Sequence, residues 1–151
     1  MVARLENKVA IVTGAGSVGP GWGNGKATAV LFAREGAHVI AADREAWAAE
    51  ETAKIIVDEG GHCTVVEVDV TNSDSVEKMT DAVLNAHGCI DVLHNNVGIT
   101  GELGGPVDIS EADWDQTFTV NVKSMYLTCN AILPAMLKAE SGSIVNVSSV
   151  A

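Results

Sequence analysis

A glycine-rich segment between residues 13 and 25 has the residue types and position best suited to binding a ligand. It reads Thr13-Gly14-Ala15-Gly16-Ser17-Val18-Gly19-Pro20-Gly21-Trp22-Gly23-Asn24-Gly25 and holds six glycines. Glycine lets the backbone turn with positive φ and approach a phosphate closely. The helix predicted to follow would offer free N–H groups at its N-terminus. The segment therefore predicts a phosphate-binding turn, and the alternative is a flexible glycine turn without a ligand.

A carboxylate at the end of the second predicted strand narrows the choice of ligand. Asp43 follows the apolar run 39–42 and comes 20 residues after Gly23. At such a position a carboxylate can accept hydrogen bonds from both ribose hydroxyls of an adenosine. It would repel a 2′-phosphate, so NAD is favoured over NADP, although the adjacent Arg44 could soften that preference. Asp43 could also be the N-cap of the following helix, and the two roles are compatible.

The elements that must position these residues alternate between strands and helices. Strands are predicted at 9–12, 39–42, 64–68, 91–94 and 143–147, and helices at 25–35, 45–59, from Ser73 to Gly88, and from the capping box Ser110-Glu111-Ala112-Asp113 onward. Strands joined through helices pair in parallel with right-handed crossovers. The sequence therefore predicts an α/β fold, a Rossmann-type doubly wound parallel sheet truncated after its fifth strand. Its ligand crevice would lie at the carboxyl ends of the strands.

The spacing of apolar residues predicts which face of each helix is buried. The inward residues are expected to be Ala27, Val30 and Leu31, then Ala49, Ala53, Ile56 and Val57, then Val76, Met79, Val83 and Leu84, and finally Trp114, Phe118, Val122, Met125 and Cys129. Ser73 is the expected N-cap of the third helix. Pro134 is a candidate kink in the fourth.

Composition excludes several classes of protein. With 9 Lys and Arg against 20 Asp and Glu, the net charge is -11, so a nucleic-acid partner is not expected. No apolar run is long enough to cross a membrane, and the N-terminus has no signal region, so we expect a cytoplasmic protein. Three widely spaced cysteines predict reduced thiols, and four histidines without ligand spacing predict no metal site. Residues 1–151 are predicted to form one dinucleotide-binding domain, incomplete at its C-terminus.

Five motifs, in order along the chain, resemble those of the short-chain dehydrogenase/reductase family. Thr13-Gly14 and Gly23-Asn24-Gly25 are similar to the ends of its motif Thr-Gly-x-x-x-Gly-x-Gly, with five residues inserted between them. The other four are Asp69-Val70, Asn95-Asn96-Val97-Gly98, Val120-Asn121-Val122 and Gly142-Ser143-Ile144-Val145-Asn146-Val147-Ser148-Ser149. Residues 14–19 also match the general pattern G-x-G-x-x-G, so the glycines that would touch a pyrophosphate stay open.

The resemblance implies an NAD(P)-dependent oxidoreductase that moves a hydride between the nicotinamide and an alcohol or ketone substrate. It implies that Ser149 holds the substrate oxygen, with Ser148 as the fallback. Asn121 would open its helix locally and hold a water; the alternative is an inert, hydrogen-bonded amide. The implied cofactor contacts are Gly14, Ser17, Gly23, Asn24, Gly25, Asp43, Arg44, Asp69, Val70, Asn96 and Gly98.

The family's catalytic tyrosine, in the motif Tyr-x-x-x-Lys, is expected beyond Ala151. The single tyrosine, Tyr126, is followed four residues later by Asn130 and does not match. The chain alone is therefore expected to be inactive, and the full-length form to be a homodimer or homotetramer. The alternative is a non-catalytic nucleotide-binding or regulatory protein. Trp22 and residues 100–106 are candidates for the border of the substrate pocket.

Overall fold

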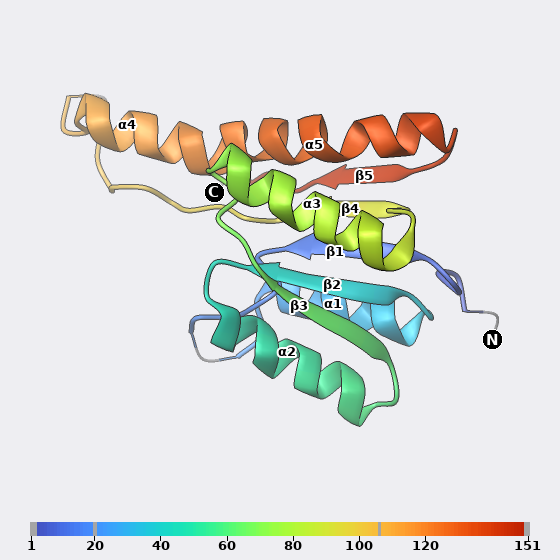
Figure 1. Ribbon diagram of the computed structural model, residues 1–151. Helices are drawn as coiled ribbons and strands as arrows, with labels where there is room; N and C mark the ends of the chain where they lie inside the picture. The colour runs from blue at the N-terminus through green and yellow to red at the C-terminus, as the bar shows by residue number, and fades with distance from the viewer. Residues whose placement is uncertain (1–2, 20, 106, 150–151) are drawn as a thin grey trace.

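The chain folds into a five-stranded parallel sheet with helices on both faces (Figure 1). The computed structural model describes residues 3–19, 21–105 and 107–149. The strands are β1 (Val9–Thr13), β2 (His38–Asp43), β3 (His62–Glu67), β4 (Val92–Asn95) and β5 (Ser143–Asn146), in the order β3-β2-β1-β4-β5. The helices are α1 (Asn24–Arg34), α2 (Ala46–Asp58), α3 (Ser73–His87), α4 (Glu111–Phe118) and α5 (Ser124–Lys138), and the π-helical turn η1 (Thr119–Lys123) joins the last two. This confirms the predicted fold, with element bounds within about two residues.

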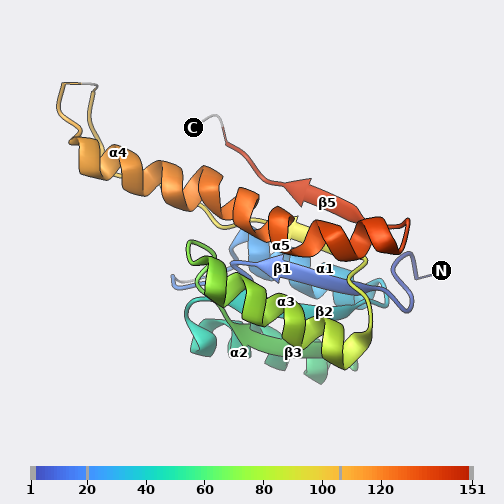
Figure 2. The same cartoon turned by 45° about the horizontal axis from the view of Figure 1, so that its top comes forward.

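Two apolar layers cover the sheet, one on each face. Ile132 and Met136 of α5 share a core with Val76 and Met79 of α3. On the other face, α1 and α2 pack through residues such as Val30 and Ile56. Figure 2 shows α3 and α5 in front of the strands, with α1 and α2 behind them. Burial on both faces explains why the central strands β1 and β2 are apolar almost throughout, whereas the outer strands β3 and β5 are partly exposed and more polar.

The predicted inward faces of α1 and α2 are wrong in part. Ala27 is exposed, and Leu31 and Val57 are 49% and 58% exposed. Each of these helices carries more apolar residues than one face can bury. In α1 the buried side is formed by Ala29, Val30 and Ala33 together with Gly25 and Lys26. Small residues on this side let the helix lie close to the sheet.

The predicted inward face of the fourth helix is wrong at its N-terminal half. Trp114, Phe118 and Val122 are 57%, 47% and 54% exposed, whereas Met125 and Cys129 are half-buried. The reason is that α4 extends past the carboxyl ends of the strands, where the sheet no longer covers it, as both ribbon views show. The predicted single helix is also interrupted at η1, while α5 runs from Ser124 to Lys138 with Pro134 inside it.

Helix N-termini follow the expected chemistry with one shift in position. Ser110 caps α4 as predicted, because its hydroxyl accepts a hydrogen bond from the Asp113 N–H at 3.1 Å. The cap of α3 is Asn72 rather than Ser73, and its side chain accepts from the Ser75 N–H at 2.9 Å. Asparagine and serine cap equally well, so the sequence alone does not choose between neighbours.

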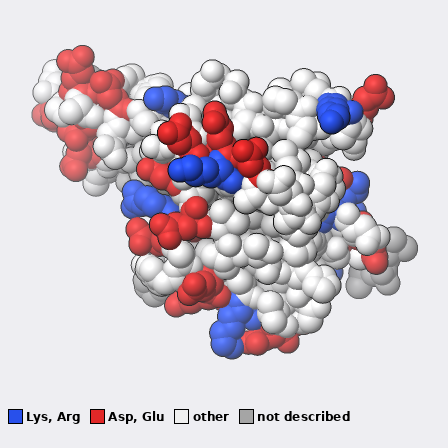
Figure 3. All heavy atoms as spheres, viewed as in Figure 1, with Lys and Arg blue, Asp and Glu red and all other residues white. Residues whose placement is uncertain are grey.

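Acidic side chains gather at the α4 end of the molecule and over α3 (Figure 3). The three cysteines are free and half-buried, and burial raises the pKa of the Cys63 thiol to about 11. Within the described ranges, no helix has both the length and the apolar character needed to span a membrane.

A buried histidine on β4 is expected to make the fold sensitive to acid. His94 is only 8% exposed, and its Nδ1 has no hydrogen-bond partner among the described residues. Burial holds the pKa of His94 below its usual value, because it disfavours the charged ring. The unfolded chain takes up this proton as the pH falls through about 6.5, before the folded chain does. Protonation therefore favours unfolding below that pH.

We expect the free energy of unfolding to decrease as the pH falls below about 6.5, by at most ~1.4 kcal/mol per pH unit for this histidine. His38 adds to the decrease, because burial, and then the neighbouring His87 and His62, lower its pKa. Urea unfolding at several pH values measures the effect. His94→Val should make the free energy of unfolding depend less on pH, and His38→Gln measures the share that His38 contributes. An unchanged slope in His94→Val would refute this assignment.

Candidate cofactor site

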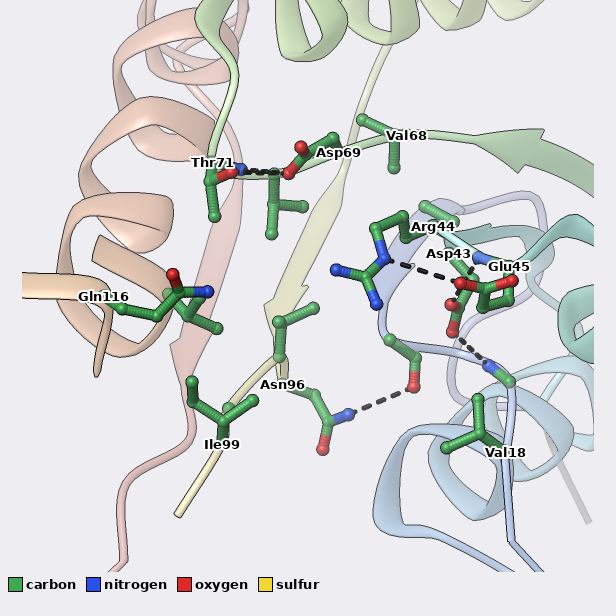
Figure 4. A pocket seen from close by; sticks show the side chains of 17 residues that line it. Val18, Asp43, Arg44, Glu45, Val68, Asp69, Thr71, Asn96, Ile99 and Gln116 are labelled. Carbon is green, nitrogen blue, oxygen red and sulfur yellow. Dashed lines mark hydrogen bonds and ion pairs between the residues drawn. The ribbon is translucent and has the colours of Figure 1, made fainter. Parts of the chain in front are cut away.

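A pocket of about 440 Å³ lies where β1, β2, β3 and β4 end, on the side predicted for the crevice. Its lining comes from the loops that follow these strands and from one side of α4 and η1 (Figure 4). The lining residues are Gly14, Gly16, Val18, Ala42, Asp43, Arg44, Glu45, Val68, Asp69, Val70, Thr71, Asn96, Val97, Gly98, Ile99, Gln116 and Val120. Loops at the carboxyl ends of parallel strands converge in this way in doubly wound sheets.

The turn after β1 packs tightly against the start of α1. Gly14 has a φ of +64°, a conformation that favours glycine, and its carbonyl oxygen accepts a hydrogen bond from Asn96 Nδ2 at 3.2 Å. A Cβ on Gly25 would lie 1.9 Å from that same carbonyl oxygen. The two glycines therefore let the strand end, the helix start and the β4 loop meet without side chains between them.

The first turn of α1 is left open to an anion. Gly23 is its N-cap, no side chain caps the helix, and no acidic residue lies in the first turn. The N–H groups of this turn have no partner within the helix, and they form the positive end of its dipole. This is the donor set that a pyrophosphate requires. Gly23, Asn24 and Gly25 surround the turn but, unlike Gly14, are not among the lining residues.

Two backbone hydrogen bonds fix the Asp43 carboxylate, and one of them joins it to the glycine turn. Its Oδ2 accepts from the Gly16 N–H at 2.8 Å and its Oδ1 from the Glu45 N–H at 3.0 Å. The N-cap of α2 is Glu45, so Asp43 contributes to that helix start without being its cap. Arg44 is exposed, with its Nε 3.5 Å from Glu45 Oε1, and Figure 4 shows its guanidinium in the pocket. The carboxylate and the turn thus form one structural unit.

A second carboxylate lies at the far side of the pocket. Asp69 Oδ1 accepts hydrogen bonds from the N–H of Thr71 at 2.9 Å and from its hydroxyl at 2.7 Å. These bonds lower the pKa of Asp69, and Arg44 contributes to the same shift. Val70, which is nearly fully buried, lines the pocket beside it. This side of the pocket offers an ionised acceptor next to an apolar surface.

Asn121 lies inside the π-helical turn, next to the pocket. Its Oδ1 accepts from the Ile99 N–H at 2.7 Å, and its Nδ2 donates to the Ile99 carbonyl at 2.8 Å. The helix is therefore opened at the position that the resemblance implied. The Asn121 amide is also fully hydrogen-bonded, as expected if it were only an inert structural amide. Ile99 lines the pocket, whereas Asn121 does not.

A buried polar network fixes the strand that leads to Ser149. Asn95 is 3% exposed; its Nδ2 donates to Asn146 Oδ1 at 2.9 Å, and its Oδ1 accepts from the Thr128 hydroxyl at 2.8 Å. The network joins β4, β5 and α5. Ser148 and Ser149 follow β5, are exposed and are not among the pocket's lining residues.

The predicted cofactor contacts and the residues that line the pocket differ in two ways. Ser17, predicted as a cofactor contact, donates its hydroxyl to the Gly19 carbonyl and does not line the pocket. Among the lining residues, Gly16 and Val18 stand within the G-x-G-x-x-G pattern without being predicted as contacts, and no motif predicts Thr71 or Gln116. Gln116 and Val120 share a helix face at a spacing of four, but only the path of α4 over the crevice reveals their place.

The family model for short chain dehydrogenases matches residues 8–151. Among curated proteins, the 3-oxoacyl-[acyl-carrier-protein] reductase FabG of Thermotoga maritima is 41% identical over 97% of this chain and 57% of its own length. The chain therefore belongs to the short chain dehydrogenase family, whose members are oxidoreductases.

Two solved structures are similar to this chain and contain nicotinamide cofactors. A metagenomic short-chain oxidoreductase in complex with NADP has a TM-score of 0.88 and 38% identity, over 97% of this chain and 64% of its own. A 7α-hydroxysteroid dehydrogenase complexed with NADH and 7-oxo glycochenodeoxycholic acid has a TM-score of 0.88 and 32% identity, over 98% of this chain and 55% of its own. The chain thus spans a little over half the length of these proteins.

Proposed function

We propose that the pocket binds NAD and serves hydride transfer between the nicotinamide and an alcohol or ketone. The observation that carries the proposal is the position of Asp43, held within hydrogen-bond distance of the glycine turn at the mouth of the crevice. The cofactor, when bound, supplies the hydride chemistry, and the chain supplies binding and orientation. The open N-terminus of α1 would hold the pyrophosphate, and Asp43 would accept from the adenosine ribose.

The carboxylate of Asp43 favours NAD over NADP in this proposal. A 2′-phosphate would bring negative charge against a carboxylate that two backbone N–H groups already fix in place. Arg44 is the one lining residue with a positive charge within the described part of the pocket, and its ion pair with Glu45 offsets that charge. One similar structure holds NADP and another NADH, so the preference rests on this chain's own residues.

Further cofactor contacts and the substrate side are assigned by position. Asp69 and Val70 would contact the adenine, and Asn96 and Gly98 the cofactor ribose. Ser149 would hold the substrate oxygen. Asn121, bonded to Ile99 through both side-chain atoms, would position the loop after β4 and a water beside it.

The proton donor is proposed to lie outside these 151 residues. Tyr126 is 63% exposed and lies near Phe118 and Val122, away from the lining of the pocket. This observation also favours a second candidate, a nucleotide-binding protein without catalysis. Oxidation of NADH monitored by absorbance, with a panel of ketones, distinguishes the two. Turnover supports the oxidoreductase; tight NADH binding without turnover on any ketone, by a protein extended past residue 151, supports the second.

The exposed apolar face of α4, η1 and the start of α5 is proposed to be the subunit interface of the full-length protein. Trp114, Phe118, Val122 and Tyr126 are all about half or more exposed, and exposed apolar groups of this kind mark association surfaces. We expect a dimer or tetramer in sedimentation experiments, and Phe118→Glu should shift it toward the monomer, with Val57→Glu on α2 as the matched control. A monomeric parent protein would contradict the assignment.

We place the protein in the cytoplasm, which cell fractionation tests.

A further inference from the structure

We propose that the substrate of this protein is an uncharged alcohol or ketone with an apolar body, and that the loop after β4, residues 97–105, selects it against anions. This proposal rests on the proposed function, because it takes the substrate to lie at the nicotinamide end of the pocket. The charge and polarity of the substrate then follow from the side chains around that end.

The order of the strands places the substrate where β4 and β5 end. Asp43 and Asp69, on the adenosine side of the proposed site, follow β2 and β3, which lie on one side of β1. A dinucleotide that crosses the strand ends therefore has its nicotinamide on the other side of β1. Ser149, proposed to hold the substrate oxygen, follows β5 on that side. The Val147 N–H donates to the Asn95 carbonyl at 2.9 Å, so the chain after β5 continues beside the loop after β4.

The loop after β4 is fixed along η1 and α4. Asn121 bonds to the N–H and the carbonyl of Ile99, at 2.7 and 2.8 Å. Two residues further on, Gly101 has a φ of +70°, and a Cβ at this position would collide with the Thr117 hydroxyl. The backbone of the loop thus lies directly on the helix, so the side chains that it presents to a substrate are held in defined positions.

Apolar side chains border the substrate end of the pocket. Val97 and Ile99 both line the pocket, and Figure 4 shows Ile99 beside Asn96, across the pocket from Asp43. Ile99 is 41% exposed, and Leu103, further along the same loop, is 91% exposed. Exposed apolar side chains are stabilised when a ligand removes them from water. A substrate with an apolar body would therefore gain affinity from this loop.

The residues that the chain contributes around β4 and β5 include no positive charge for an anion. The sequence has no lysine or arginine from residue 79 to 122 or from 139 to 151. Arg44 is the one cation that lines the described part of the pocket, and it follows β2 beside Asp43. Lys123 borders a separate hollow together with Tyr126. A carboxylate or phosphate on the substrate would therefore leave water without a counter-charge, which costs free energy.

Glu102 makes the loop actively unfavourable for anions. It is exposed, and it forms no ion pair with any residue that the structure describes. It follows Ile99 by three residues, so the two Cα atoms lie at most about 11 Å apart. This separation is close to the Debye length at physiological salt, so the repulsion of an anion beside Ile99 is only partly screened.

The test compares ketones that differ in charge but hardly in shape. The pairs are para-acetylbenzamide with para-acetylbenzoate, and levulinamide with levulinate. A protein extended past residue 151 is assayed with NADH, whose hydride, together with one proton, converts each ketone to its alcohol. The value of kcat/KM should be about tenfold higher for the carboxamide of each pair. Calorimetry of the same ketones on the NAD-loaded protein should give the same order of affinity without turnover.

Two variants assign the selectivity to the loop. Glu102→Lys should reduce the ratio of kcat/KM between carboxamide and carboxylate about fivefold, because attraction replaces repulsion. The matched control Glu50→Lys makes the same change of charge at an exposed position on α2 and should leave the ratio unchanged. Thermal unfolding of both variants verifies that the fold is intact.

The proposal is overturned if the parent protein uses the carboxylates as well as the carboxamides, or if Glu102→Lys and Glu50→Lys change the ratio equally. In either case turnover of any ketone with NADH leaves the proposed function standing. A protein that binds NADH but reduces no ketone of either charge overturns the oxidoreductase function, and the proposed substrate class with it.

Discussion

Replacing Gly25 with alanine is expected to destabilise the fold by about 3 kcal/mol and to abolish cofactor binding. The added Cβ would lie 1.9 Å from the Gly14 carbonyl oxygen and 2.6 Å from Asn96 Nδ2. Backbone atoms cannot move away as a flexible side chain can, so α1 must shift away from the turn. That shift would misplace the N–H groups at the start of α1. Thermal unfolding and calorimetry with NADH measure the two effects.

The matched control is Gly19→Ala in the same glycine-rich segment. A Cβ at Gly19 meets nothing within 4 Å, and its φ is not in the left-handed region. This variant should keep the stability and affinity of the parent. A Gly25→Ala protein with an unchanged melting temperature would show that the contact between α1 and the turn is wrong.

Replacing Asp43 with asparagine is expected to weaken NADH binding about a hundredfold and to reduce the preference for NADH over NADPH. The carboxylate would lose its charge and part of its capacity to accept two ribose hydroxyls, and hydrogen bonds to charged groups contribute about 1.5–3 kcal/mol each. An amide also removes the repulsion of a 2′-phosphate. Dissociation constants for both reduced cofactors measure the change.

Glu67 on β3 offers a matched control for Asp43. It lies opposite Asp43 in the sheet register but is exposed and does not line the pocket. Glu67→Gln should leave both dissociation constants unchanged. If Asp43→Asn bound NADH as tightly as the parent protein, the ribose contact would have to be assigned to another residue.

The order of elements was predictable because each strand is a short apolar run followed by an amphipathic segment. Asp43 and Gly14 could be placed at the same edge of the sheet for the same reason: both follow strands that run in parallel. Among the motif residues, Asn96 lines the pocket, whereas Asn95 is buried beneath it and Asn121 reaches only the lining residue Ile99. The local sequence was therefore sufficient to predict the position of a site residue wherever that position depends only on the end of a strand.

The buried faces and the shape of the loop were not predictable in the same way. Leu31 and Val57 satisfy helical periodicity, but the sheet contacts the neighbouring stripes of small residues instead. Trp114 and Phe118 are apolar at helical spacing, yet α4 extends past the sheet. The six glycines do not reveal which of them contacts Asp43, because the hydrogen bond from Gly16 depends on how the turn after β1 packs against Ala48.

Calorimetric titration of the purified protein with ADP-ribose is the most direct measurement of the central claim, since this ligand contains the pyrophosphate and the adenosine but no nicotinamide. Saturable one-to-one binding, weakened by Asp43→Asn and unaffected by Glu67→Gln, is the predicted result. No detectable heat with the parent protein, or equal affinity in Asp43→Asn, would contradict it.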